Sequence, residues 1–178
     1  MSNTDALYQD IILDHNRRPR NHHPLEGDAR QAAGRNPLCG DEVTVWLRLD
    51  GDRIAEASFV GRGCAISKAA ASLMTTAVEG RTRDEAETLF DRFHDVVTGK
   101  IPPAEARTLG TALAVFSGVA RFPVRVKCAS LPWHAMRAAL HDASAPVTTD
   151  DPAGRIASGP TDVSVTGSSA GDARRSGH

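Results

Sequence analysis

Residues 43–49 read Val-Thr-Val-Trp-Leu-Arg-Leu, so that the aliphatic side chains occupy every second position. A period of two places alternate side chains on the same face of a strand, which predicts a strand with one buried face. Asp50-Gly51-Asp52 then supplies a turn, because glycine accepts a positive φ, and residues 53–60 return as a second strand. We therefore expect an antiparallel hairpin.

Apolar residues recur at helical spacing both before and after this hairpin in the sequence. Thr82-Arg83-Asp84-Glu85 has the form of a capping box, in which the Thr82 side chain and the Glu85 side chain satisfy free backbone amides at a helix start. The expected helices run from Thr4 to near Pro19, from residue 66 to Gly80, from Thr82 to Gly99 and from Ser130 to about His141, with one or two more within 104–119. Residues 17–37 are expected to be loop with one short strand near 28–33, and residues 124–127 an extended entry to Cys128.

The composition changes near the C-terminus. Beyond Ala143 the sequence consists mainly of serine, glycine, threonine, aspartate and proline, with few large apolar residues. Such a segment cannot bury enough surface to offset the entropy of ordering it. We predict one domain over residues 1–142 and a disordered tail over residues 143–178.

Overall charge argues against some classes of partner. The 178 residues include 21 lysines and arginines against 22 acidic residues, so no net positive charge favours nucleic acid or an anionic membrane. No stretch approaches the roughly 20 apolar residues of a membrane helix, and the N-terminus has no signal-peptide pattern. We expect a soluble, cytoplasmic protein whose partner is a protein or a small molecule.

The three cysteines are too few for a disulfide framework, and each occupies an informative context. Cys39 precedes Gly40-Asp41 at the mouth of the hairpin, so a thiolate and a carboxylate can face a common point. Cys64 begins a predicted helix, where free amides and the helix dipole favour the thiolate. Cys128 comes just before the helix expected at Ser130. Each cysteine is therefore expected at a junction between elements.

Three interpretations of these cysteines remain open on the residues alone. Three thiolates and the Asp41 carboxylate form a tetrahedral set suited to zinc or to the iron of a cluster. The thiols could equally be inert core residues, or one of them could be a lone nucleophile. Histidines are ordinary packing residues in this interpretation, because Asp41 completes the ligand set.

The neighbourhoods of the cysteines resemble the NifU/IscU superfamily of iron–sulfur assembly proteins. Residues 8–21 are similar to its opening helix, while Asn36-Pro37-Leu38-Cys39-Gly40-Asp41 and Gly61-Arg62-Gly63-Cys64-Ala65-Ile66-Ser67 are similar to its first two ligand motifs. Within the superfamily the SufU type is most similar. Lys127 stands where scaffold-type proteins have histidine, and residues 99–122 resemble the SufU insertion ahead of the closing motif at 122–133.

This resemblance implies an α+β fold, with a small antiparallel β-sheet of about three strands packed by about five α-helices. It also implies zinc bound by Cys39, Asp41, Cys64 and Cys128. Cys39 matches the cysteine that accepts sulfur from a pyridoxal-phosphate-dependent, SufS-like cysteine desulfurase, after a histidine of that partner takes a place on the metal. The chain would then be a sulfurtransferase-like carrier.

The resemblance leaves one competing function, an IscU-like scaffold that builds an iron–sulfur cluster on the same ligands. For the carrier, a SufB-type scaffold complex is a possible receiver of the sulfur. Arg125 and Lys127 lie beside the last ligand, Cys128, in the sequence. Their side chains either reduce the negative charge of the ligand set or face solvent.

Overall fold

The computed structural model of the protein describes residues 3–143 and 145–149. Strands and helices follow one another in a mixed α+β order. The elements are α1 (Asn3–Arg17), β1 (Arg30–Asn36), β2 (Asp41–Asp50), β3 (Arg53–Arg62), α2 (Ala65–Val78), α3 (Arg83–Val97), α4 (Pro103–Ala106), the 3₁₀ helix η1 (Arg107–Leu109), α5 (Thr111–Ala114), the 3₁₀ helix η2 (Val115–Arg121), α6 (Pro123–Leu140) and β4 (Val147–Thr148).

The four strands of the described chain form one sheet in the order β3-β2-β1-β4. β1 and β3 flank β2 in antiparallel pairing, whereas the two-residue β4 lies parallel to β1. The α+β class and the three antiparallel strands are confirmed. β4 makes the sheet mixed, which differs from the expected purely antiparallel sheet, because the chain returns along β1 after α6.

The predicted hairpin is present as β2 and β3. Gly51 occupies the turn with φ of +61°, a conformation that suits glycine. Val43, Val45 and Leu47 are buried on the inner face, and the residues between them are half-buried on the outer face. The alternation in the sequence therefore sets the face of the sheet that carries the core.

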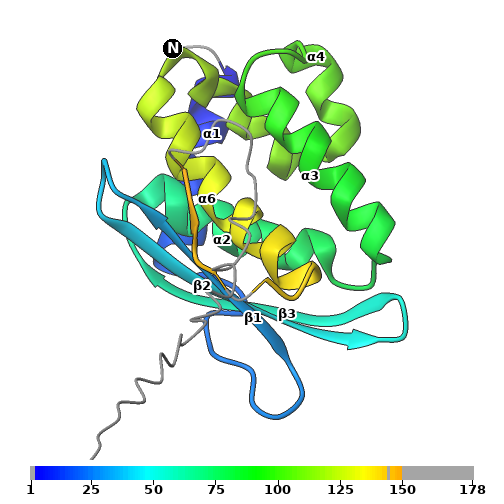
Figure 1. The fold of residues 1–178 in the computed structure, drawn as a ribbon. Helices are drawn as coiled ribbons and strands as arrows, with labels where there is room; N and C mark the ends of the chain where they lie inside the picture. The colour runs from blue at the N-terminus through cyan, green and yellow to red at the C-terminus, as the bar shows by residue number, and fades with distance from the viewer. Residues whose placement is uncertain (1–2, 144, 150–178) are drawn as a thin grey trace, which may run out of the picture.

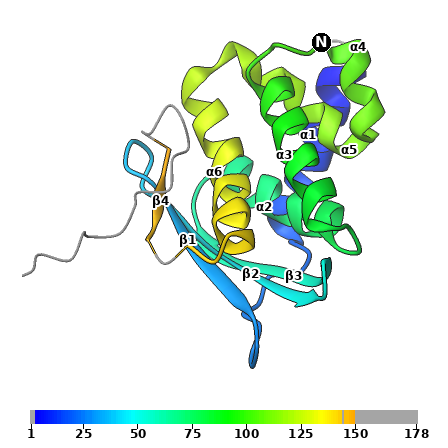
Figure 2. The same ribbon diagram turned by 45° about the vertical axis from the view of Figure 1, so that its right-hand side comes forward.

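The longer helices lie on the side of that inner face, and within residues 3–143 and 145–149 no helix covers the other face of the sheet (Figures 1 and 2). α6 lies against β1 and β2, α2 lies against β3 and α6, and α1 packs on α2. Trp133 of α6 is fully buried and stacks on Phe93 of α3, with ring centroids 4.5 Å apart. The capping box at Thr82 and Glu85 is confirmed at the start of α3.

The last long helix begins earlier than the sequence predicts. Residues 124–127 are helical, not extended, and α6 starts at Pro123. Proline fits the first position of a helix, where its missing N–H leaves no bond unmade, and it restricts only the preceding residue. Phe122 is accordingly extended, with φ of −128° and ψ of 90°. Cys128 therefore lies inside α6 and not at a junction.

The segment between α3 and α6 folds as four short helical pieces, α4, η1, α5 and η2. They pack beside α3 and α1 at the end of the molecule away from the β2–β3 turn (Figure 1). Among the described residues, no helix has the length and apolar character to cross a bilayer. The predicted boundary at residue 142 stays a prediction, since residues 150–178 of the expected tail lie outside the described part.

Candidate metal centre

The first two candidate ligands lie on the connection between β1 and β2. Asn36 and Asp41 are paired across the two strands, and the Gly40 amide donates to the Asn36 carbonyl at 2.8 Å. Gly40 has φ of +70°, which closes this tight connection. Cys39 consequently lies exposed on the turn, whereas Asp41, the first residue of β2, is only 2% exposed.

Cys64 is the N-cap of α2, as the sequence predicts. Its Sγ accepts a hydrogen bond from the Ser67 amide at 3.4 Å, and its own amide donates to Asp41 Oδ1 at 3.0 Å. The Asp41 carboxylate can approach this closely because residue 63 is glycine. A Cβ at Gly63 would lie 2.6 Å from Asp41 Oδ1.

Cys128 enters the same region from the second turn of α6. Its side chain is buried, with 3% exposure, and its Sγ lies 3.4 Å from Cys39 Sγ. The cysteine is brought into position by the packing of α6 on β1 and not by a chain junction. The predicted convergence of the cysteines therefore has a different local cause at this position.

Three of the four predicted ligands form one compact group, and the fourth, Cys64, adjoins it. The ligand atoms of Cys39, Asp41 and Cys128 lie within 4.8 Å of one another. Cys64 Sγ adjoins this group at 3.7 Å from Asp41 Oδ2 and through a hydrogen bond with Cys128. The centre thus combines side chains from a turn, a strand, a helix N-cap and a helix interior.

The donor chemistry and spacing fit a zinc ion. Ligand atoms bound to tetrahedral zinc at about 2.3 Å are separated by about 3.8 Å. The distances of 3.4 Å between Cys39 Sγ and Cys128 Sγ and 3.7 Å between Cys64 Sγ and Asp41 Oδ2 are close to this value. In the described part of the chain, the group able to hold a metal contains no histidine.

The two thiols nearest the helices have opposite acidities. The hydrogen bond from Cys128 lowers the pKa of Cys64 to about 7, against the opposing effect of burial, and the Ser67 amide lowers it further. The same hydrogen bond, together with burial, raises the pKa of Cys128. Without a metal, Cys64 is therefore about half ionised near pH 7, while the neighbouring Cys128 stays protonated.

Asn36 belongs to the centre, although the sequence suggested no role for it. Its side chain is fully buried, and its amide nitrogen lies 3.4 Å from Cys39 Sγ and 3.8 Å from Cys128 Sγ. Its Oδ1 accepts from the Leu38 amide at 3.2 Å. Its position at the start of the motif Asn36-Pro37-Leu38-Cys39-Gly40-Asp41 was the available signal.

Other predicted residues lie outside the ligand group. Arg125 is exposed, with its guanidinium 4.6 Å from the centre of the Phe122 ring, and Lys127 is half-buried. His15 binds Ser72 Oγ through Nδ1 at 2.7 Å and joins α1 to α2. His94 and His134 pack around Phe90. The histidines at these three positions are packing residues, as expected.

Comparison with known proteins gives the family of this fold and centre. Residues 7–145 match the pattern described as the NifU-like N-terminal domain. The chain belongs to that family. The matched range contains all four candidate ligands and the segment between α3 and α6.

Individual relatives of this NifU-like chain carry two different names. It is 40% identical over 141 residues to the iron–sulfur cluster assembly scaffold protein IscU of Streptococcus pyogenes serotype M1, covering 79% of this chain and 86% of the relative. It is also 40% identical over 135 residues to the zinc-dependent sulfurtransferase SufU of Bacillus subtilis, covering 76% and 90%. The sequence identity is the same for both relatives, so it does not favour one of these two names over the other.

Solved structures confirm the fold of the NifU-like chain. A candidate iron–sulfur cluster assembly scaffold protein for the SUF system from Fervidobacterium islandicum AW-1 superposes with a TM-score of 0.69. That chain is 32% identical in sequence, and the superposition covers 76% of this chain and 97% of the other. The superfamily resemblance drawn from the sequence motifs is therefore confirmed.

Proposed function

We propose that this protein is a zinc-dependent sulfur carrier of iron–sulfur cluster assembly, which takes persulfide sulfur from a cysteine desulfurase onto Cys39. The observation that carries the proposal is the placement of Cys39. Its thiol is exposed on the β1–β2 turn, yet it lies 3.4 Å from the buried Cys128 thiol. Cys39 and Cys64 are exposed, whereas Cys128 and Asp41 are buried, so a partner protein can reach the Cys39 sulfur from the surface.

Cys39, Asp41, Cys64 and Cys128 would hold the zinc, which would keep the thiols deprotonated at neutral pH. Three thiolates and one carboxylate carry more negative charge than one divalent ion. The Asp41 oxygen is a harder ligand than a thiolate, so it gives the set a weaker member. The relative named as a zinc-dependent sulfurtransferase supports the choice of metal.

The sulfur transfer step belongs to Cys39. Its thiolate attacks the outer sulfur of a persulfide on the desulfurase cysteine, so that a new S–S bond forms on Cys39 as the old one breaks. The desulfurase cysteine leaves as a thiolate, which keeps charge and atoms balanced. The Asn36 amide, 3.4 Å from Cys39 Sγ, orients the attacking sulfur.

The sulfur donor in this proposal is a pyridoxal-phosphate-dependent, SufS-like enzyme, which supplies the cofactor that this chain would not need. A downstream SufB-type scaffold is the corresponding receiver. In both steps a cysteine sulfur of one protein must reach Cys39 of the other. The exposure of Cys39 and of the neighbouring Leu38, which is 64% exposed, supports such direct contact between proteins.

A scaffold that assembles an iron–sulfur cluster on the same ligands is the second candidate, because the relative named IscU is equally similar to this chain. The presence of Lys127 directly before Cys128, in place of the histidine of scaffold-type proteins, favours the carrier. Purified carrier is colourless and holds zinc. Visible absorption restored by iron and sulfide would identify the scaffold instead.

The decisive experiment measures desulfurase turnover with and without this protein, with Cys39→Ser as the matched variant. We expect the wild type to accelerate turnover and to gain the mass of one sulfur atom on the peptide that contains Cys39. The Cys39→Ser variant should do neither. A wild-type protein that never acquires sulfur from the desulfurase would make the centre purely structural and would end the proposal.

A further inference from the structure

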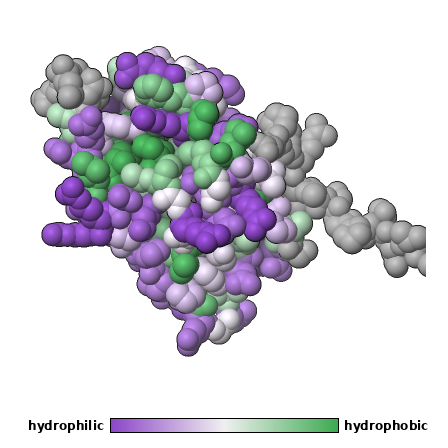
Figure 3. All heavy atoms as spheres, turned by 90° about the vertical axis from the view of Figure 1, so that its left-hand side faces the viewer, coloured by the Kyte–Doolittle hydropathy of each residue, from purple (hydrophilic) through white to green (hydrophobic). Residues whose placement is uncertain are grey.

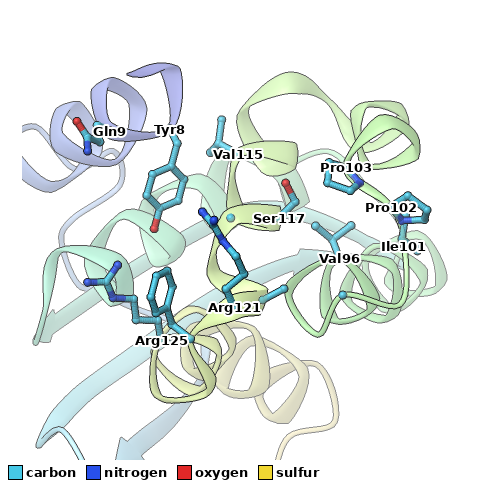
Figure 4. A pocket seen from close by; sticks show the side chains of 14 residues that line it. Tyr8, Gln9, Val96, Ile101, Pro102, Pro103, Val115, Ser117, Arg121 and Arg125 are labelled. Atoms are coloured by element: carbon cyan, nitrogen blue, oxygen red, sulfur yellow. The ribbon is translucent and has the colours of Figure 1, made fainter. Parts of the chain in front are cut away.

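A pocket of about 560 Å³ lies at the start of α6, the helix that carries Cys128. It is enclosed by α1, the end of α3, the loop before α4, η2 and the first turn of α6. Its floor is apolar, with Val96, Ile101, Pro102, Pro103 and Val115 among the lining residues (Figure 4). This volume lies within the roughly 300–1,000 Å³ of typical ligand pockets, so a short peptide segment can enter it.

The mouth of the pocket carries positive charge. Arg121 and Arg125 both line it, and Arg121 extends between Tyr8 and Ser117 (Figure 4). Their guanidinium groups lie 5.8 Å and 4.6 Å from the centre of the Phe122 ring. Within residues 3–143 and 145–149, no aspartate or glutamate lines the pocket. The positive charge is therefore available to an acidic group that enters from outside.

Apolar side chains extend this region over the surface. Phe122 and Val124, at the start of α6, are 44% and 54% exposed. Hydrophobic side chains gather in the upper half of the face in Figure 3, the side where η2 and the start of α6 lie in Figure 1. A large exposed apolar area bordered by charge is typical of a surface that binds another protein.

None of the described lining residues is a candidate ligand, but Tyr8 and Arg125 of the lining lie near the metal centre. The Tyr8 hydroxyl is hydrogen-bonded to Arg125, which lies one helical turn before Cys128 in α6. Burial raises the pKa of Tyr8, Arg125 lowers it, and the negative charge of Cys64 raises it. The Tyr8 ring thus lies within electrostatic reach of a candidate zinc ligand and at the same time lines the pocket.

We propose that this pocket binds an acidic, apolar segment of the cysteine desulfurase, with its carboxylate at Arg121 and Arg125 and its apolar side chains on Ile101, Pro102 and Pro103. This assignment rests on the proposed function, since it names the sulfur donor as the partner. Charge complementarity and the contact of Tyr8 with both regions favour this occupant. A segment seated at Arg125 would lie one helical turn from Cys128 along α6.

The segment between α3 and α6 supplies most of the pocket, including Ile101, Val115 and Arg121. Arg121 is exposed and lies outside the ligand group, so its substitution leaves the metal centre intact. Charge contacts at the mouth would mainly set the association rate and its dependence on salt. The apolar floor would provide the contacts that slow dissociation.

The experiment measures the affinity of the full chain for the cysteine desulfurase of the same organism, by titration calorimetry, separately from sulfur transfer. The test variants are Arg121→Glu and Ser117→Leu. Arg121→Glu reverses the charge at the mouth of the pocket, and Ser117→Leu places a larger side chain at a half-buried position of its lining. Arg107→Glu is the matched control, because Arg107 is an exposed arginine of the same segment that does not line the pocket. Zinc content and circular dichroism verify that each variant is folded.

We expect Arg121→Glu and Ser117→Leu each to raise the Kd at least tenfold, and Arg107→Glu to leave it within twofold. Sulfur transfer at saturating desulfurase should persist in Arg121→Glu. Unchanged affinity in both test variants, with normal transfer in the wild type, would overturn the pocket assignment and leave the proposed function standing. A wild type that binds the desulfurase but accepts no sulfur would overturn only the proposed function, and a wild type that does not bind would overturn both.

The chain's own residues 150–178 are the alternative occupant, because Asp162-Val163-Ser164-Val165 also combines an acidic group with apolar side chains. Backbone NMR of the isolated full chain tests this case. If Asp162→Lys shifts the amide signals of Ser117 and Gly118, the chain fills its own pocket and the assignment to the desulfurase is wrong. Unshifted signals, with the tenfold loss above, support the proposal.

Discussion

The carboxylate of Asp41 accepts a hydrogen bond from the backbone amide of Cys64 at 3.0 Å, and this bond ties the first residue of β2 to the N-cap of α2. The contact depends on the absence of a side chain at Gly63, where a Cβ would lie 2.6 Å from Oδ1 and 2.8 Å from Cγ of Asp41. The ligand geometry therefore relies on a residue that offers no ligand itself.

Gly63→Ala is expected to displace the Asp41 carboxylate, because the new methyl group occupies its position. We expect a lower zinc stoichiometry after dialysis and a loss of stability of about 1–3 kcal/mol, the usual cost of overpacking. Zinc analysis and urea unfolding measure the two effects. Gly118→Ala is the control, since its Cβ meets only the Tyr8 ring at 3.7 Å. Equal zinc content in the two variants would contradict the role of Gly63.

Asn36→Ala removes the amide beside Cys39 Sγ and Cys128 Sγ and the acceptor of the Leu38 amide. We expect a stability loss of about 1–3 kcal/mol, because a buried polar group loses its partner. We also expect slower sulfur uptake by Cys39. Asn21→Ala is the control, since the Asn21 amide binds Thr75 Oγ1 at 3.2 Å, away from the centre. If both variants accept sulfur at the same rate, Asn36 has no part in transfer.

The zinc-stripped protein should be alkylated at its cysteines in a fixed order. The pKa of Cys64 is lowered to about 7, mainly by the hydrogen bond from Cys128, so its labelling rate should reach half its maximum near pH 7. Cys128 should react last, because that hydrogen bond and burial keep it protonated. Iodoacetamide labelling with peptide mass spectrometry at several pH values gives the order. Labelling of Cys128 before Cys64 would show that the hydrogen bond between these two residues is absent.

The folded protein should lose stability as the pH falls below about 6.5, the ordinary pKa of histidine. Burial lowers the pKa of His15, and the charge of Arg20 lowers it further, so the unfolded chain binds this proton more readily than the folded one. Stability therefore rises with pH through this range. The contribution of His15 should be smaller than the limit of about 1.4 kcal/mol per pH unit for one proton, because the side chain is partly solvated.

His15→Gln should make the loss of stability between pH 7.5 and 5.5 shallower. Unfolding in urea, followed through the fluorescence of the buried Trp133, measures the difference. His23→Gln is the control, because His23 is exposed. A slope unchanged by His15→Gln would assign the pH dependence to other groups, of which His94 is the first, since burial lowers its pKa as well.

Short sequence patterns predicted much of the fold because they reflect interactions between residues that are close together in the sequence. The alternation at 43–49, the turn at Gly51 and the capping box at Thr82 each depend on neighbours in the sequence, and all three are present. The predicted start of α6 was wrong because proline restricts the residue before it in the same way whether a helix or a strand follows. Only the tertiary packing of α6 on the sheet distinguishes the two cases.

The sequence predicted which residues belong to the candidate centre, but not which elements bring them together. The sequence contexts of all three cysteines pointed to a shared site, but the junction expected at Cys128 was wrong, because Cys128 lies in a helix interior. Asn36 escaped notice because its contacts with two sulfurs arise from the pairing of β1 with β2. The pocket likewise depends on how α1 meets η2, which no spacing within either segment encodes.

The pairing of Asn36 with Asp41 across β1 and β2 links assembly of the centre to the folding of the sheet. A slip of β1 by one residue would turn every side chain of that strand to the opposite face and would move Asn36 out of the core. The strand register that buries Val43 and Val45 is thus the register that aligns the sulfurs. A chain with the wrong register would be unable to hold the proposed zinc ion, so zinc retention would be a direct assay of native register.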